Sequence, residues 1–427
     1  MKKLLHPAAL MAIIWAATAL LFYASPISYV HAPGFVAWSI VCAGALLFCL
    51  GAVAGASLRW PAAARLDTPS PDRLIIVCAA MGFIGIAAML IDKLLLSDID
   101  WSAGFSAARD RRVVEVMANI PVRRSWLLYA GYLTFSFSCV ALTAFILAGD
   151  RLRSFASLCG QASVLPMVAY AVLYGGRMPI LLVIILVASA GLARLLVSRS
   201  FFPRGQWLWW KLAAVAAAML AYTNFIWESR RQLNGIANYG DFVAVAASRW
   251  ELSPAPWLDR AVLDGRIAAT RLMDWLSIDL YLTHAVTTVQ RMVEHWGEFS
   301  IYGGLYQIGI LSPLSDALAP SLQLAARMRA ELSAAGTFGW FPTAWGAWIG
   351  DAGPAGGAIC ILIWGMLSGM AYRAARENGS LLSQLMLAFG YMCVFVSPLN
   401  GPFGLANSFL IFVSFATIGL LWRRVAG

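Results

Sequence analysis

The stretch LIIVCAAMGFIGIAAMLIDKLLL, residues 74–96, decides the class of fold. Its only charged residues are Asp92 and Lys93, close to its end. An α-helix needs about 20 consecutive, mainly apolar residues to cross the hydrocarbon core of a bilayer. This stretch is long enough, so it predicts a transmembrane helix.

Similar runs occur along the whole chain of 427 residues. Hydrophobic residues make up 61% and charged residues 12% of the sequence, and the mean hydropathy is +0.74. A soluble domain is roughly half apolar and a quarter charged, so this composition excludes a soluble enzyme, a disordered protein and a small secreted disulfide module. The apolar runs cover residues 8–24, 34–56, 74–96, 126–148, 155–174, 179–196, 207–226, 352–371, 380–397 and 403–421. We expect an all-α polytopic membrane protein with about ten transmembrane helices.

The basic residues of the short loops predict the orientation of these helices. Cytoplasmic loops carry an excess of lysine and arginine, and here they fall in every second loop, whereas the turns 25–33 and 398–402 have none. The basic residues of the expected cytoplasmic loops are Arg59, Arg65, Arg73, Arg151, Arg153, Arg199, Arg204, Lys211, Arg373 and Arg376. The two outer segments 97–125 and 227–350 also carry arginines and are the exceptions to the pattern. This pattern places both termini in the cytoplasm.

Three parts follow along the chain. Residues 1–226 hold the first seven helices, residues 227–350 form one long extracytoplasmic segment, and residues 351–427 hold the last three helices. A loop of that length is usually functional. Apolar residues recur at helical spacing over 257–296, which predicts one or two amphipathic helices, and the glycine-interrupted stretch 301–318 predicts a re-entrant or interfacial element.

Arg177 is the first candidate for anion binding. It follows Gly175 and Gly176 and precedes Pro179, a residue suited to the first turn of a helix. The arginine therefore stands beside the positive end of a helix dipole, and the glycines leave room for a bulky anion such as a phosphate. The alternative to anion binding is an arginine at the membrane interface whose side chain only extends its charged group into water.

Two more basic clusters are expected on the extracytoplasmic side. The first cluster, which follows the seventh apolar run, consists of Glu228, Arg230 and Arg231. Two adjacent arginines could bind a diphosphate. The alternative is a solvated helix end without a binding role. His284, Thr288, Arg291 and His295 are spaced by four, three and four residues, so they share one helix face. Such a stripe suits a sugar hydroxyl or a phosphate, although amphipathic helices also produce polar stripes without a binding role.

The candidate bases are the acids expected near the extracytoplasmic surface, namely Glu228, Asp241, Asp279 and Asp351. No histidine pair or CxxC spacing predicts a metal site. The seven cysteines lie in or beside apolar runs, which is typical of small buried side chains.

Two motifs resemble those of the bacterial oligosaccharide repeat-unit polymerases, the O-antigen (Wzy-type) polymerases. The sequence Trp348-Ile349-Gly350-Asp351-Ala352-Gly353-Pro354 leads into a glycine-rich run, and Gly176-Arg177-Met178-Pro179 opens a mid-chain helix. The family pattern has an aromatic residue after the aspartate, where this chain has Ala352, and a glycine eleven positions after the arginine, where this chain has Ala188.

The resemblance implies a membrane glycosyltransferase of the bacterial inner membrane that is active at its periplasmic face. The substrates would be repeat units linked through pyrophosphate to a polyprenyl lipid, joined with inversion and without a cofactor. Membrane lipids and a chain-length regulator protein are the implied partners, and nucleic acid is not. Arg177, Arg230, Arg231 and Arg291 would hold the pyrophosphate, while Asp351, His284 or Glu228 would accept the proton of the attacking hydroxyl.

Two other functions compete with this one. An O-antigen ligase, or another lipid-dependent glycosyltransferase, would use the same arginines. A polysaccharide transporter or flippase is disfavoured because transporters tend to place ionisable residues near the bilayer midplane, whereas here such residues collect at one face.

Overall fold

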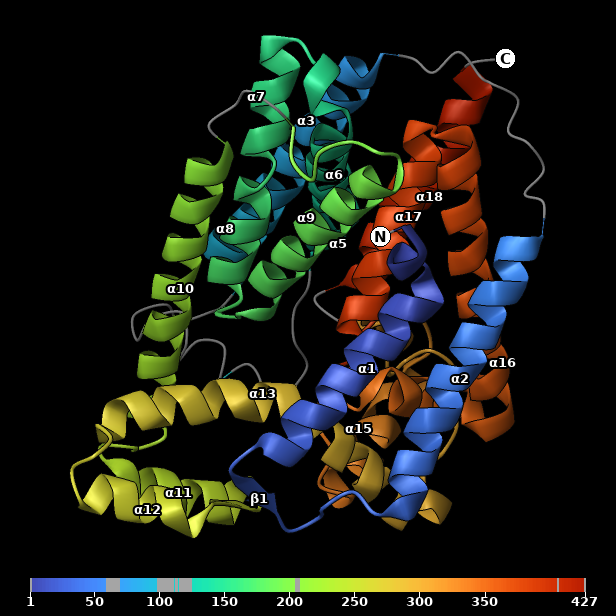
Figure 1. Ribbon diagram of the computed structural model, residues 1–427. Helices are drawn as coiled ribbons and strands as arrows, with labels where there is room; N and C mark the ends of the chain where they lie inside the picture. The colour runs from blue at the N-terminus through green and yellow to red at the C-terminus, as the bar shows by residue number, and fades with distance from the viewer. Residues whose placement is uncertain are drawn as a thin grey trace.

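The computed structural model describes residues 2–58, 70–97, 111, 114, 125–203, 208–404 and 407–425. The loop residues Arg59, Arg65 and Arg204 lie outside these ranges, as does the side chain of Arg230. The described chain is almost entirely helical (Figure 1).

Seven segments of the described chain are long and apolar enough to cross a membrane. The helices that form them are α1 (Pro7–Ala24), α2 (Phe35–Ser57), α3 (Pro71–Ile91, extended by a π-helical turn over Asp92–Leu96), α5 (Trp126–Phe135) with α6 (Phe137–Ala148), α7 (Ser154–Ala162) with α8 (Leu165–Leu173), α9 (Met178–Leu196) and α16 (Thr343–Asn378). The expected all-α membrane protein is confirmed. The other three expected runs are occupied by α10 (Leu208–Leu233), α17 (Leu381–Val396) and α18 (Ser408–Val425). These three helices are not among the seven segments, so the expected total of ten membrane-spanning helices stays a prediction.

Two of the expected runs are each divided into two helices. Run 126–148 is interrupted at Ser136, between α5 and α6, and run 155–174 is interrupted just before α8. Pro166 lies in the first turn of α8, where its missing N–H group and fixed φ are tolerated. Inside a continuous helix the same residue would remove a backbone hydrogen bond.

Helices α2 and α16 pack with their backbones in contact. A methyl group added to Gly51 or Gly55 of α2 would overlap the backbone oxygen of Leu362 or Met366 on α16. Gly365 and Gly369 of α16 approach the backbone of α2 equally closely. Such small-xxx-small pairs let membrane helices associate through close van der Waals contact.

One long helix lies across an end of the bundle, which we call the α13 end. This helix is α13 (Ala269–Glu294), and it runs roughly at right angles to the membrane-spanning helices (Figure 1). Beyond it lie α11 (Tyr239–Arg249) and α12 (Pro256–Leu263). Helices α12 and α13 lie where the sequence predicted one or two amphipathic helices, over residues 257–296.

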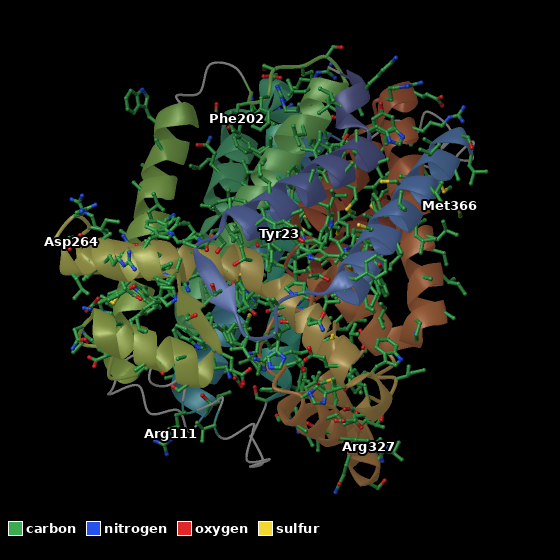
Figure 2. All side chains as sticks on the ribbon, turned by 60° about the horizontal axis from the view of Figure 1, so that its bottom comes forward. Tyr23, Arg111, Phe202, Asp264, Arg327 and Met366 are labelled. Carbon is green, nitrogen blue, oxygen red and sulfur yellow. The ribbon has the colours of Figure 1, made fainter. Side chains whose placement is uncertain are left out.

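Short elements fasten this layer to the bundle. Strand β1 (Ile27–Tyr29), just after α1, pairs antiparallel with β2 (Leu252–Pro254). The stretch 301–318 consists of turns followed by α14 (Leu311–Leu318), and α15 (Leu324–Ala334) comes next. Figure 2 brings this end forward, with Asp264, between α12 and α13, and Arg327, on α15, at separate places on it.

Candidate functional site

The described candidate residues all belong to the α13 end. Arg177 occupies the N-cap position of α9, Glu228 and Arg231 lie in the last turns of α10, and Asp351 lies near the start of α16. His284 and Arg291 are on α13 itself. Their contacts divide them into four groups.

The first group joins Arg177 to His284 through an aromatic ring. The guanidinium carbon of Arg177 lies 4.4 Å from the ring centroid of Tyr281, and Nη1 donates to Ser277 Oγ at 3.5 Å. The ring of Tyr281 meets that of His284 edge to face at 6.0 Å. Ser277, Tyr281 and His284 are spaced by four and three residues, so one face of α13 presents all three to the start of α9.

His284 is buried in an aromatic cage. The rings of Trp340 and Phe341 lie 5.0 and 5.7 Å from the imidazole, which is 5% exposed. Nδ1 lies 2.6 Å from the backbone oxygen of Leu280, so Nδ1 carries the proton and donates it. Burial lowers the pKa of His284 to about 4, because a charged imidazole loses its hydration there. The side chain is therefore neutral at pH 7, and the lone pair on Nε2 receives the backbone N–H of Phe341 in a long hydrogen bond of 3.5 Å.

The second group neutralises one of the candidate arginines. Arg231 Nε and Nη2 lie 2.9 and 2.8 Å from the two carboxylate oxygens of Glu228, a bidentate ion pair. Hydrogen bonding from Arg231 holds the pKa of Glu228 below its ordinary value, since it stabilises the charged carboxylate. Glu228 is therefore a weak base, and an anion at Arg231 would compete with it.

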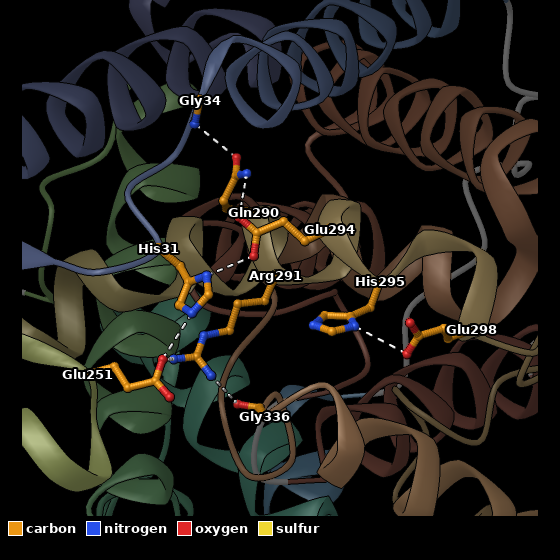
Figure 3. A network of polar contacts seen from close by, with 9 residues as sticks. All are labelled: His31, Gly34, Glu251, Gln290, Arg291, Glu294, His295, Glu298 and Gly336. Carbon is orange, nitrogen blue, oxygen red and sulfur yellow. Dashed lines mark hydrogen bonds and ion pairs between the residues drawn. The ribbon is translucent and has the colours of Figure 1, made fainter.

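The third group is a network around Arg291 and His31, drawn in Figure 3. Arg291 forms an ion pair with Glu251 and donates from Nη1 to the backbone oxygen of Gly336 at 3.0 Å. His31 Nε2 lies 3.0 Å from Glu251, and Nδ1 lies 2.7 Å from Glu294. Partial burial tends to raise the pKa of Glu294, but hydrogen bonds from Gln290 and His31 leave it below its ordinary value. This network links the α1–α2 turn, α13 and the segment before α16.

His295 and Thr288 stand apart from that network. His295 pairs with Glu298 three residues on, at 3.2 Å, and Thr288 is buried with its hydroxyl 3.4 Å from the backbone oxygen of His284. His284, Thr288 and Arg291 lie on α13, whereas His295 is the C-cap residue that follows it, and the four side chains have different partners.

The fourth group surrounds Asp351, whose two carboxylate oxygens receive backbone N–H groups. Tyr306 N donates to Oδ1 at 2.9 Å and Gln307 N donates to Oδ2 at 3.0 Å. The residue is 4% exposed and lies two residues before Gly353, where the helix kinks at φ 69° and ψ 175°. The carboxylate of Asp351, placed just before the kink, holds the turns before α14 in position through these two hydrogen bonds.

Sequence reasoning missed the aromatic partners of this end. Tyr281 could have been found from its spacing to His284 on α13, whereas Trp340 and Phe341 arrive from a distant segment that no local pattern connects to α13. Within the described residues, no group of three histidine, cysteine or acidic side chains could hold a metal ion. No protein-family model, curated protein or solved structure matches the chain.

Proposed function

We propose that this protein is a membrane glycosyltransferase that polymerises oligosaccharide repeat units linked through pyrophosphate to a polyprenyl lipid. The observation that carries the proposal is the joining of Arg177, at the N-terminus of α9, to the neutral His284 through Tyr281. An arginine on a positive helix end suits a phosphate, and an imidazole lone pair suits a hydroxyl. Both substrates of such a reaction thus have a matching group.

The reaction balances with these two groups. The acceptor hydroxyl oxygen forms a bond to the anomeric carbon as the bond from that carbon to the pyrophosphate oxygen breaks. Arg177 and the N-terminal N–H groups of α9 stabilise the charge that develops on the departing polyprenyl pyrophosphate. In this proposal the acceptor hydroxyl displaces the long hydrogen bond from Phe341 N–H, 3.5 Å from Nε2 of His284. Nε2 then accepts the hydroxyl proton late in the reaction, because bond formation to carbon makes that proton acidic enough for a weak base.

The remaining candidate residues support this centre from other places. Arg231 is paired with Glu228 and Arg291 with Glu251, so we assign both to holding α10 and the α13 layer together. Asp351 positions the turns before α14. In this proposal the α13 end faces the periplasm, the chain lies in the bacterial inner membrane with both termini in the cytoplasm, and a chain-length regulator protein is a further partner.

The experiment compares deletion and point variants in the bacterium of origin. Loss of a polymerase leaves lipopolysaccharide with single repeats and no ladder; loss of a ligase leaves bare core with polymer on its carrier lipid, and loss of a flippase traps units inside. Either of the last two patterns would overturn the proposal.

Arg177 is then tested with purified protein and lipid-linked repeat units. We expect Arg177→Ala to slow polymerisation by about a hundredfold, and Arg177→Lys to slow it nearly as much because an ammonium lacks the planar fork. Arg153→Ala is the control, since the Arg153 side chain is 90% exposed and precedes α7, a helix at the end of the bundle away from α13 (Figure 1). Full activity in Arg177→Ala would remove this residue from the mechanism.

A further inference from the structure

His31 lies where three segments of the α13 end meet. The residue follows β1 and precedes α2, and hydrogen bonds fix the chain on both sides of it. On one side, Val30 N donates to the backbone oxygen of Glu251 at 3.0 Å. On the other side, Gly34 N donates to the side-chain oxygen of Gln290 on α13 at 2.9 Å. The imidazole is therefore held between the segment before β2 and the last turns of α13 (Figure 3).

Both ring nitrogens of His31 face carboxylates. Nε2 lies 3.0 Å from Glu251, and Nδ1 lies 2.7 Å from Glu294. A neutral imidazole donates from only one nitrogen and presents a lone pair at the other, whereas a protonated imidazole donates from both. The two contacts can therefore both be hydrogen bonds only when the ring carries a positive charge. The side chain is 33% exposed, so its proton can exchange with water.

The charges around the ring balance in that protonated state. The titratable and charged side chains that surround the ring in this network are Glu251, Arg291, Glu294 and His295, with Glu298 as the partner of His295. Glu251 and Glu294 carry two negative charges, and Arg291 carries one positive charge. The pKa of Glu294 lies below its ordinary value despite partial burial, because hydrogen bonds stabilise its charged form. The protonated ring supplies the second positive charge.

The backbone at Glu251 supports a role for its carboxylate. The residue has a φ of +52°, in the left-handed region, and directly follows Trp250, the C-cap residue of α11. Glycine is the usual residue at such a position, because a side chain is strained there. The strained glutamate places its carboxylate between the ring of His31 and the guanidinium of Arg291.

Arg291 extends the network to the segment before α16. Its Nη2 binds the same carboxylate oxygen of Glu251 that His31 Nε2 faces. Its Nη1 donates to the backbone oxygen of Gly336 at 3.0 Å. The position of the guanidinium therefore depends on the carboxylate, and the position of the carboxylate depends on the charge of the histidine ring.

The segment that begins at Gly336 builds the cage of His284. Trp340 and Phe341 follow Gly336 closely in the chain and place their rings 5.0 and 5.7 Å from the imidazole. Phe341 N also lies 3.5 Å from Nε2 of His284. The amide that the acceptor hydroxyl has to displace thus belongs to the segment that Arg291 holds.

We propose that His31 is a positioning residue whose protonated ring holds Glu251 in place and thereby fixes the segment that surrounds His284. The inference rests on the proposed function, because His284 is the proton acceptor of that reaction. When the ring of His31 loses its proton, one of its two hydrogen bonds becomes a contact between lone pairs, and the segment 336–341 loosens. This contribution to activity is present at acidic pH and is lost at alkaline pH.

Two substitutions of His31 separate its charge from its hydrogen-bonding shape. His31→Gln introduces a neutral side chain that donates at one end and accepts at the other, as a neutral imidazole does. His31→Arg introduces a side chain that is charged at every pH and can donate to both carboxylates. The matched control is His295→Gln, because His295 lies at the same end of α13 and pairs with Glu298.

The first measurement is the rate at which the purified full chain polymerises lipid-linked repeat units, between about pH 6 and pH 9. At the acidic limit, His31→Gln should lower kcat by about tenfold with little change in KM, because one charge-assisted hydrogen bond is lost away from the substrate. The ratio of the wild-type rate to the His31→Gln rate should fall towards one as the pH rises. His31→Arg should keep its advantage over His31→Gln at every pH.

Two results of this measurement would overturn the proposal. One is an equal kcat for wild type and His31→Gln at the acidic limit. The other is a kcat for His31→Arg that is as low as that of His31→Gln, since the charge of the side chain would then have no effect. His295→Gln should keep the wild-type rate.

The second measurement is amide hydrogen exchange at about pH 6, which requires no activity. Peptides that contain residues 337–341 should exchange faster in His31→Gln than in wild type, because the bond from Arg291 to Gly336 is weakened. In His31→Arg and His295→Gln they should exchange at the wild-type rate. Peptides from α6, a fully buried helix, should exchange equally in all four proteins, which shows that each of them is folded.

The two measurements separate this inference from the proposed function. Exchange that follows the charge of residue 31, together with an unchanged ladder in the deletion strain, would refute the polymerase alone. A lost ladder in the deletion strain, together with equal exchange of residues 337–341 in all four proteins, would refute the positioning role of His31 alone.

Discussion

Nη1 of Arg291 donates to the backbone oxygen of Gly336 at 3.0 Å, and this bond joins α13 to the segment that leads into α16. Gly336 has a φ of +65°, and a methyl group on its α-carbon would overlap Nη1 of Arg291. Two independent constraints therefore favour glycine at this position. The left-handed backbone disfavours a side chain, and the guanidinium occupies the space that a side chain needs.

Gly336→Ala should therefore destabilise the α13 end. We expect a loss of about 1–3 kcal/mol from the strained backbone and the displaced guanidinium, visible as a lower unfolding temperature of the purified protein. Gly297→Ala is the control, since nothing lies within 4 Å of an added methyl group there and its φ is not positive. The same unfolding temperature in both variants would contradict this account.

The buried imidazole of His284 predicts a dependence of stability on pH. Its pKa of about 4 in the folded protein lies below the ordinary value of 6.5, so the unfolded chain binds the proton more readily. Stability is then complete above pH 6.5 and falls as the pH drops towards 4, by about 3 kcal/mol in full. His284→Asn, which keeps a donor near Leu280, should flatten this part of the profile.

The control for this measurement is His295→Asn. His295 lies outside the aromatic cage and pairs with the exposed Glu298, so its replacement removes a histidine while leaving the cage around His284 intact, and the fall in stability that depends on His284 should remain. Parallel profiles for wild type and His284→Asn would show that His284 is not buried as a neutral imidazole.

A substitution at Asp351 can show whether this residue acts as a catalytic base or only positions the turns before α14. Asparagine offers one oxygen where the carboxylate offers two, so Asp351→Asn leaves Tyr306 N or Gln307 N without an acceptor. We expect a loss of about 1–3 kcal/mol, measured as a lower unfolding temperature that accompanies the loss of polymerisation. An inactive variant with unchanged unfolding would instead identify a base. Glu228→Gln, at an exposed ion pair, is the comparison.

The membrane-spanning helices could be predicted because a bilayer imposes length and apolarity on each of them. Local breaks such as Ser136 were not predictable, since they leave the hydropathy of the run unchanged. Within the site, the common face of His284 and Arg291 follows from helical spacing. Their partners do not, because Trp340, Gly336 and Glu251 come from segments whose relative placement depends on the whole fold.

Lys93 and Arg194 show the same limit for single charges. Each lies near the end of an apolar run, where an arginine or lysine is ordinarily a residue that reaches towards water. The structure buries both, Lys93 at 7% and Arg194 at 0% exposure. Burial of a cation at such a position depends on which acceptors the neighbouring helices bring, and the sequence of the run does not contain that information.

Arg194 holds α9 to the end of α6, at the end of the bundle opposite α13 (Figure 1). Nη1 donates to the backbone oxygens of Ile146 and Leu147 at 2.8 and 3.1 Å, and Nη2 lies 2.6 Å from the Asp150 carboxylate. Nε donates to the backbone oxygen of Ser200 at 2.7 Å. The last carbonyl groups of a helix have no partner within it, so this side chain acts as the C-terminal cap of α6.

Arg194→Met should thus unfold the protein at a lower temperature while leaving the α13 end unchanged. Methionine keeps the apolar stem but leaves all of these acceptors, and Ser200 Oγ at 3.4 Å, without their donor, and we expect a loss of about 3 kcal/mol. Arg194→Lys should recover only part of it, because an ammonium cannot reach backbone oxygens and Asp150 in the planar arrangement of the guanidinium. Arg153→Met, which removes an exposed arginine at the same end, controls for charge. If Arg194→Met and Arg153→Met unfold at the same temperature, the buried arginine is not the cap of α6.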